Sequence, residues 1–244
     1  MSSRSELLRV IEKIETVRLD ESIYLIIGNN RGTFPYCNAL LIVDDDAVLI
    51  DSGCGNEIME QLADNVDILI NSHYHIDHIL GNALIGELWV VEEEAGVTSS
   101  FEKYRQYAGI YNEPVEEEWL AWFHDWFVFI PSKHTRTFHT NEAFDFGDTK
   151  WQVVHTPGHS PGGIVLIGNG VVFSGDTLFQ FSIGRTDFPG GSYSQLMTGI
   201  FEHLMVLPDE TIVYSGHGPQ TTIGMEKKAN PFVRDWARRM AEES

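Results

Sequence analysis

Residues 73–78 read His-Tyr-His-Ile-Asp-His and follow an apolar, strand-like run, so three imidazoles and one carboxylate fall within six positions. In an extended loop, residues two apart project from the same side, so His73 and His75 can bind one ion together. Asp77 and His78 then project elsewhere, free to hold a second ion or to orient a water between two. Imidazole nitrogen combined with carboxylate oxygen favours zinc, iron or manganese over calcium or magnesium. The segment therefore predicts a metal site at the end of a strand.

Three further candidate ligands stand alone in the sequence, each after an apolar run and beside glycine or proline: His159, Asp176 and His217. Loops at strand ends are where catalytic groups collect, and glycine lets the backbone turn sharply or approach a site. Taken singly, each of these residues would be interpreted as a packed or capped side chain. Together with the first cluster they supply six or seven ligands, which is enough for two ions.

Two neighbouring cations, about 3.5 to 4 Å apart, can share a water, lower its pKa and stabilise the oxyanion formed when it attacks a carbonyl. A shared carboxylate balances their charge. We predict Asp176 as this bridge and Asp77 as the residue that both binds metal and orients the nucleophile, and these are the two expected catalytic residues. A ligating histidine usually donates its other N–H to an oxygen, a role that suits Asp51. The alternative for Asp51 is that it opens a turn or caps a helix starting at Asn56.

Around these residues, short apolar runs alternate with helical periods, which predicts an α/β protein without internal repeats. Helical spacing is found at residues 56–63, 194–207 and 224–240. The tight connection at residues 44–46 predicts a hairpin between the second and third strands. Strand character is found at residues 23–27, 39–43, 47–50, 67–70, 87–91, 151–155, 163–167, 171–174 and 211–215.

Residues 92–144 interrupt this rhythm, because they carry no clear strand pattern and contain a dense aromatic run from Trp119 to Phe127. We interpret the segment as a helical, aromatic-rich insertion within a single domain spanning residues 1–244. The aromatic run can serve as a lid, a pocket wall or an oligomer surface, or simply form the hydrophobic face of a helix.

The 244 residues include 16 Lys+Arg against 36 Asp+Glu, a formal net charge of -20. Such a chain repels phosphate backbones and anionic lipid, so nucleic acid and membrane surfaces are not expected as partners. The start lacks the apolar core of a signal peptide, and no apolar run approaches the roughly 20 residues of a membrane-spanning helix. We therefore expect a cytoplasmic protein whose two cysteines, Cys37 and Cys54, are reduced thiols.

The order of these candidate ligands resembles that of the metallo-β-lactamase superfamily, over about residues 20–230. The resemblance implies a four-layer αββα sandwich with metals at one edge, between the two sheets, and Asp51 matches the family's early aspartate. It further implies two sites of three ligands joined by one bridging carboxylate: His73, His75 and His159; Asp77, His78 and His217; and the bridge Asp176.

Two longer strings, residues 181–192 and 216–232, are similar to those of bacterial and archaeal glyoxalase II-like hydrolases. These enzymes are similar to hydroxyacylglutathione hydrolase, which cleaves small-molecule acyl thioesters. The resemblance implies that a metal-bridging hydroxide attacks the thioester carbonyl and that a thiolate, of pKa about 8.5 to 9, leaves without a strong acid. Zinc is favoured for the two ions, with iron or manganese as alternatives. We expect Arg185 and Asp187 to form a pair that supports the site rather than to act on substrate.

Other functions remain open at this point. Persulfide dioxygenases of the same superfamily share the Gly-Arg-Thr-Asp string at residues 184–187 and hold one iron through the equivalents of His73, His159 and Asp176. Lactonases and phosphodiester-cleaving members carry a similar ligand set, and a non-enzymatic metal-holding scaffold is a further alternative. Only 27 residues follow His217, which leaves no room for the helical glutathione-binding domain of full-length enzymes, so the thiol of the substrate is not fixed.

Overall fold

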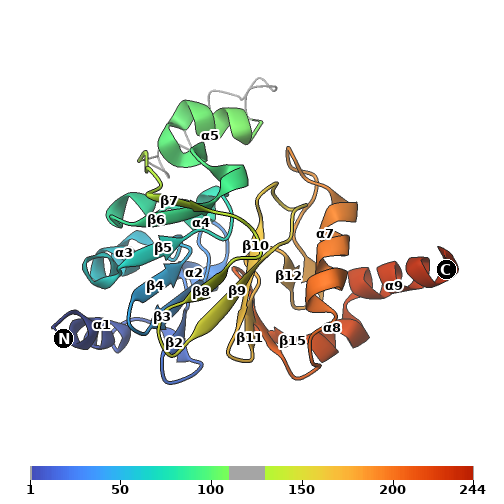
Figure 1. The fold of residues 1–244 in the computed structure, drawn as a ribbon, viewed down its shortest axis with the longest axis horizontal. Helices are drawn as coiled ribbons and strands as arrows, with labels where there is room; N and C mark the ends of the chain where they lie inside the picture. The colour runs from blue at the N-terminus through green and yellow to red at the C-terminus, as the bar shows by residue number, and fades with distance from the viewer. Residues whose placement is uncertain (1, 110–129, 244) are drawn as a thin grey trace.

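Two β-sheets lie face to face in the computed structural model, which describes residues 2–109 and 130–243, and helices cover the outer face of each sheet (Figure 1). The helices on one outer face come from the first half of the chain, and those on the other come from its end (Figure 1). This is the four-layer αββα sandwich, and it confirms the predicted fold class.

The first sheet has seven strands in chain order, from β1 to β7. Neighbours from β1 to β4 are antiparallel, and those from β4 to β7 are parallel. The strands are β1 (Thr16–Arg18), β2 (Ile23–Ile26), β3 (Ala39–Val43), β4 (Ala47–Ile50), β5 (Ile68–Ile70), β6 (Leu88–Val91) and β7 (Arg136–Phe138).

The second sheet has six strands in the order β15-β14-β11-β10-β9-β8, and only β11 and β14 are parallel neighbours among its described strands. A small hairpin, β12 and β13, lies apart from both sheets. The strands are β8 (Ala143–Asp145), β9 (Lys150–His155), β10 (Ile164–Gly168), β11 (Val171–Phe173), β12 (Leu178–Phe179), β13 (Ser182–Ile183), β14 (Ile212–Tyr214) and β15 (Thr221–Thr222).

The helices on the outer faces are α1 (Ser2–Ile11) and α3 (Asn56–Leu62) against the first sheet, and α7 (Tyr193–Gly199), α8 (Ile223–Ala229) and α9 (Pro231–Glu243) against the second (Figure 1). A π-helix, η5 (Ile200–Leu204), continues α7. The remaining helical elements are α2 (Asn29–Gly32), η1 (Ala63–Asn65), α4 (Ile76–Ile79), η2 (Asn82–Leu84), η3 (Glu92–Glu94), η4 (Val97–Ser99) and α5 (Phe101–Tyr107).

Three buried apolar layers hold the sandwich together. Alternate residues of β3 divide between two of them, because side chains of a strand point to opposite faces. Leu40 and Ile42 face the second sheet, while Leu41 and Val43 face α1 and α3. The layer between the sheets also contains Phe173, which is completely buried. The third layer lies between the second sheet and the helices α7 to α9.

All nine strands expected from the sequence are present, with ends within one residue of the prediction, and the β3–β4 hairpin is confirmed. The prediction that no strand lies in residues 92–144 is wrong, because β7 and the start of β8 fall there. Six strands of two or three residues escaped prediction, since such short edge segments are too brief to display a period. Their pairing with a neighbouring strand, not their own sequence, makes them strands.

The single helix expected at residues 224–240 is also a wrong prediction, because the structure has two helices that meet at Asn230 and Pro231. Proline supplies no backbone N–H and disfavours helical geometry in the residue before it, and Asn230 is extended here. The Asn230 side chain then accepts a 3.0 Å hydrogen bond from the Phe232 N–H and starts the next helix.

Three other expectations concern the surface and the termini. The aromatic run from Trp119 to Phe127 lies outside the described residues, so its proposed roles stay predictions. None of the helices within residues 2–109 and 130–243 has the length and apolar character that crossing a membrane requires. Cys37 and Cys54 are both buried free thiols, as predicted.

Phe173→Ala should lower the free energy of unfolding by about 3 to 5 kcal/mol, because it removes a completely buried ring from the layer between the sheets. Urea denaturation followed by circular dichroism measures this change. Val206→Ala, at a side chain that is 70% exposed, is the control and should change it by less than about 0.5 kcal/mol. Equal effects of the two substitutions would contradict the inter-sheet packing.

Candidate metal centre

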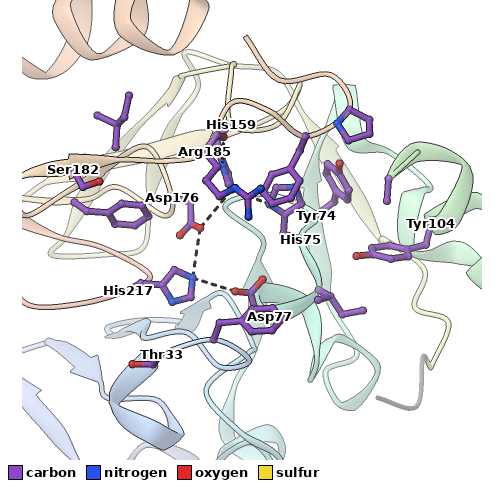
Figure 2. A pocket seen from close by; sticks show the side chains of 17 residues that line it. Thr33, Tyr74, His75, Asp77, Tyr104, His159, Asp176, Ser182, Arg185 and His217 are labelled. Atoms are coloured by element: carbon purple, nitrogen blue, oxygen red, sulfur yellow. Dashed lines mark hydrogen bonds and ion pairs between the residues drawn. The ribbon is translucent and has the colours of Figure 1, made fainter. Parts of the chain in front are cut away.

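The candidate site lies at one edge of the two sheets, where several strands end. Residues 73–78 follow β5 of the first sheet, while His159, Asp176 and His217 follow β9, β11 and β14 of the second. The side chains of His75, Asp77, His159, Asp176 and His217 point toward one another (Figure 2), and donor atoms of His73 and His78 lie within 4.8 Å of those of their neighbours in the set. All seven ligands expected from the sequence are therefore brought together, although His73 and His217 are 144 positions apart in the chain.

The first group of donors consists of His73, His75 and His159, whose ring nitrogens lie within 4.8 Å of one another. His75 Nδ1 is 2.8 Å from His159 Nε2. Burial lowers the pKa of all three imidazoles, that of His75 to about 3, so each ring is neutral and offers a lone pair. His73 Nε2 is buried and has no hydrogen-bond partner among the described residues. An unsatisfied nitrogen of this kind fits a metal ligand.

The second group consists of Asp77, His78 and His217, again within 4.8 Å. Asp77 Oδ2 lies 3.1 Å from His217 Nε2 and 4.0 Å from His78 Nε2. Both Asp77 and His78 belong to the short helix α4. The helix turns the chain, so these two side chains point in a different direction from those of His73 and His75. The structure thus separates residues 73–78 into two pairs, as the spacing predicts.

Asp176 lies between the two groups. Its Oδ2 is 3.5 Å from both His159 Nε2 and His217 Nε2, and its Oδ1 is 3.2 Å from His78 Nε2. A carboxylate in this position can reach an ion on either side. Its location therefore agrees with the bridging position expected for it.

The charges of the second group are coupled. Burial would raise the pKa of Asp77 and of Asp176, but neighbouring His78 and His217 hold both values below the usual range. Burial would lower the pKa of His217, but Asp176 and then Asp77 raise it to about 11. Two buried carboxylates thus draw protons onto the imidazoles beside them. A divalent cation can supply the same positive charge, so the donor set fits metal.

The second ring nitrogen of four histidines contacts an oxygen, which fixes each ring. His73 Nδ1 lies 3.0 Å from the Ser72 hydroxyl, and His78 Nδ1 lies 2.7 Å from the Asp51 carboxylate. In the other sheet, His159 Nδ1 donates to the Arg185 carbonyl and His217 Nδ1 to the Gly32 carbonyl, each at 2.7 Å. The opposite nitrogens are left to face the centre.

Asp51 is completely buried beneath the site. Besides its contact with His78, it accepts 2.7 Å hydrogen bonds from the backbone N–H and the hydroxyl of Ser72. Helix α3 has Gly55 at its N-cap and no side-chain cap, so the alternative role of Asp51 as a helix cap is not found.

Cys37 lies close to Asp51 and His78, but burial raises the pKa of its thiol and so disfavours the thiolate that binds metal.

Arg185 and Asp187 form an exposed bidentate pair with N–O distances of 2.9 and 2.7 Å. The guanidinium also stacks over the ring of Phe188, 4.4 Å from its centroid. These contacts fix the loop whose Arg185 carbonyl orients His159. The supporting role expected for the pair stays a prediction.

Sequence reasoning missed Glu94, a carboxylate that is only 5% exposed. One of its oxygens accepts hydrogen bonds from the Ser160 hydroxyl at 2.8 Å and from the Gly162 N–H at 3.1 Å, so it fastens the loop that carries His159. Burial raises the pKa of Glu94 to about 8. Its signal in the sequence was its place just after the strand at 88–91, the same position that the other site residues occupy.

With this geometry established, comparison with known proteins identifies the family. The family model described as metallo-beta-lactamase superfamily matches residues 32–217. The chain belongs to this superfamily. It is a metallo-hydrolase, and the histidine and aspartate clusters at its sheet edge can hold metal.

Similar proteins in the superfamily include the hydroxyacylglutathione hydrolase GloC of Haemophilus influenzae, 34% identical over 211 residues that cover 80% of this chain and 92% of that protein. The structure of the BLEG-1 B3 metallo-beta-lactamase is 28% identical with a TM-score of 0.61, and covers 90% of this chain and 98% of that one. TTHA1623 in a di-iron-bound form is 28% identical with a TM-score of 0.58, and covers 90% and 100%.

Gly216→Ala should weaken metal binding by about 10- to 100-fold, the effect typical of disturbing the surroundings of a ligand. A Cβ at this position would lie 2.5 Å from His78 Cε1 and 2.8 Å from Asp176 Oδ1, so these side chains would have to move. Calorimetric titration of the metal-free protein with Zn²⁺ measures the change. Gly86→Ala, whose Cβ would meet nothing within 4 Å, is the control. Unchanged affinity in Gly216→Ala would contradict the ligand role of its neighbours.

Glu94→Gln should flatten the pH dependence of stability between about pH 5 and pH 8. The native state keeps a proton on Glu94 up to about pH 8, whereas the unfolded chain loses it at about pH 4.3. The free energy of unfolding therefore falls as the pH rises through this window. Because a glutamine side chain does not titrate, the free energy of unfolding of the variant should fall less over the same pH range. Urea denaturation at several pH values measures the difference, with exposed Glu60→Gln as control. Parallel curves for Glu94→Gln and the parent would refute the protonated carboxyl.

Proposed function

We propose that this metallo-hydrolase cleaves an acyl thioester of the hydroxyacylglutathione type, with two divalent ions held by the seven side chains at the sheet edge. The observation that carries the proposal is the placement of Asp176 within 3.5 Å of histidines from both donor groups. When bound, two adjacent ions supply a water of lowered pKa and positive charge for the oxyanion. Zinc is the proposed metal, with iron or manganese as alternatives.

The residues of the site have separate proposed roles. Asp77 lines the cavity next to the site, so we propose that it orients the attacking water as well as binding metal. Asp176 balances the charge of both donor groups from between them. Asp51 and the Arg185 carbonyl keep the rings of His78 and His159 in place. No acidic group is required for the leaving thiolate, since an alkyl thiol has a pKa of about 8.5 to 9.

The relatives support parts of this proposal. The similarity to a hydroxyacylglutathione hydrolase favours thioester cleavage, and the similarity to a protein with a di-iron-bound form favours two ions. We further propose a cytoplasmic protein, since both of its cysteines are free thiols. Nucleic acid remains an unexpected partner, and oligomerisation through the aromatic run at residues 119–127 remains a prediction.

Metal analysis coupled to a substrate panel tests the proposed activity. Protein purified without chelator should contain two divalent ions per chain and hydrolyse thioesters in preference to lactones and β-lactams, and chelation should abolish the activity. Mass spectrometry of the metal content and a thiol-release assay measure these quantities. A single ferrous ion, with oxygen consumed on glutathione persulfide and no thioester cleavage, would show the protein to be a dioxygenase instead.

Asp77→Ala should lower kcat for thioester hydrolysis by at least about 100-fold, because it removes the group proposed to orient the nucleophile. Circular dichroism should remain that of the parent protein. Asp209→Ala, at an exposed carboxylate paired with Lys227, removes the same side chain away from the site and should leave kcat unchanged. Full activity in Asp77→Ala would rule out its proposed role.

A further inference from the structure

The cavity next to the metal centre has a volume of about 800 Å³, a size typical of small-molecule sites. One end of it is formed by the candidate ligands, including His75, Asp77 and His217 (Figure 2). Away from them its described walls are largely aromatic and aliphatic: Phe34, Tyr74, Ile76, Tyr104, Phe179 and Phe188. Phe34 is 55% exposed at this wall.

Positive charge is scarce around this cavity. Away from the metal centre, Arg185 is the one lysine or arginine among the described residues that line it, and its Nε and Nη2 donate to Asp187. Lys227 lies outside the residues that line the cavity and donates to Asp209 and to the Leu207 carbonyl. Residues 110–129 contain neither lysine nor arginine in their sequence, and the chain as a whole carries a net charge of -20.

A glutathione thioester carries two carboxylates and one ammonium on its thiol part. With its carbonyl at the metal ions, these carboxylates would lie toward the apolar walls, where no lysine or arginine among the described lining residues is without a carboxylate partner. Charges of like sign repel, and carboxylates on an apolar wall lose hydration without gaining a partner. An uncharged apolar group, in contrast, would displace water from the aromatic walls at no such cost. The cavity is therefore complementary to neutral apolar groups.

We propose that the substrate is a thioester that is neutral and apolar on both sides of the carbonyl, and that the cavity discriminates against glutathione as the thiol. This inference rests on the thioester cleavage proposed above and departs from the hydroxyacylglutathione type in both the thiol and the acyl group. In the reaction, the oxygen of water bonds to the acyl carbon, and the carbon–sulfur bond breaks with its electron pair on sulfur. The products are a carboxylate, a neutral thiol that takes one proton of the water, and a second proton released to solvent.

The test compares hexanoyl thioesters of glutathione and of N-acetylcysteamine, which share the acyl group but differ in the charge of the thiol. The metal-loaded protein should have at least about tenfold higher kcat/KM for the neutral thioester at low ionic strength, and added salt should narrow the difference by screening. Equal or better use of the glutathione thioester overturns the inference and leaves the proposed function standing. Failure to cleave either thioester overturns both.

Thr33→Arg provides a second, independent measurement, because Thr33 is an exposed residue of the cavity wall. The added cation should raise kcat/KM for the glutathione thioester about three- to fivefold, as expected of one exposed ion pair, and change the neutral one less than twofold. Thr33→Gln is the control of similar bulk without charge. If Thr33→Arg does not alter the ratio of the two kcat/KM values, charge is not what excludes glutathione.

Phe34→Ala tests the apolar part of the proposal with hexanoyl and acetyl thioesters of N-acetylcysteamine. Losing this ring should lower kcat/KM for the hexanoyl compound about fivefold more than for the acetyl compound, since only the longer chain can cover it. An equal effect on both thioesters would mean that the aromatic wall does not bind the acyl chain, and would overturn this part of the inference.

Discussion

The packing of the two sheets against each other is the constraint on which the candidate metal centre depends. Each donor group takes two ligands from the first sheet and one from the second, so neither group exists within one sheet alone. Backbone hydrogen bonds cross between the sheets directly beside the ligands, from Ile164 to Ser72 at 2.9 Å and from Asn38 to Gly216 at 2.7 Å. A shift of one sheet would therefore separate both groups at once.

Buried carboxylates outside the ligand set reinforce this arrangement. Asp51, Glu94 and Glu226 are each almost wholly buried, and each is satisfied by several hydrogen bonds, as a buried charge or acid requires. Glu226 accepts bonds from the Phe181 N–H and from Asn230, which ties helix α8 to the segment leading into β13. The residues of the 216–232 string that follow His217 thus support the site from outside, without lining the cavity.

Reaction chemistry and substrate choice have separate structural sources in this protein. The donors stand at strand ends held by the two sheets, whereas the cavity walls come from α5, β12 and the loops around Phe34 and Phe188. Loops vary more readily than the sheets they connect. Members of one superfamily can therefore share the metal centre and differ in the charge and shape of the cavity beside it.

Nine strands and the seven candidate ligands could be predicted from the sequence alone, because alternation, strand-end loops and the spacing of residues 73–78 are local properties that a linear pattern records. The spacing of the residues left open which ligands share a group; the family resemblance implied the two groups, and the packing of the sheets brings each group together. Tertiary structure also decided the short edge strand β7, whose partner residues in β6 lie 47 positions earlier in the chain, and the hydrogen bonds by which Glu94 holds the His159 loop. The charge balance of the cavity also depends on the tertiary structure, because residues that are distant in the chain line the cavity together.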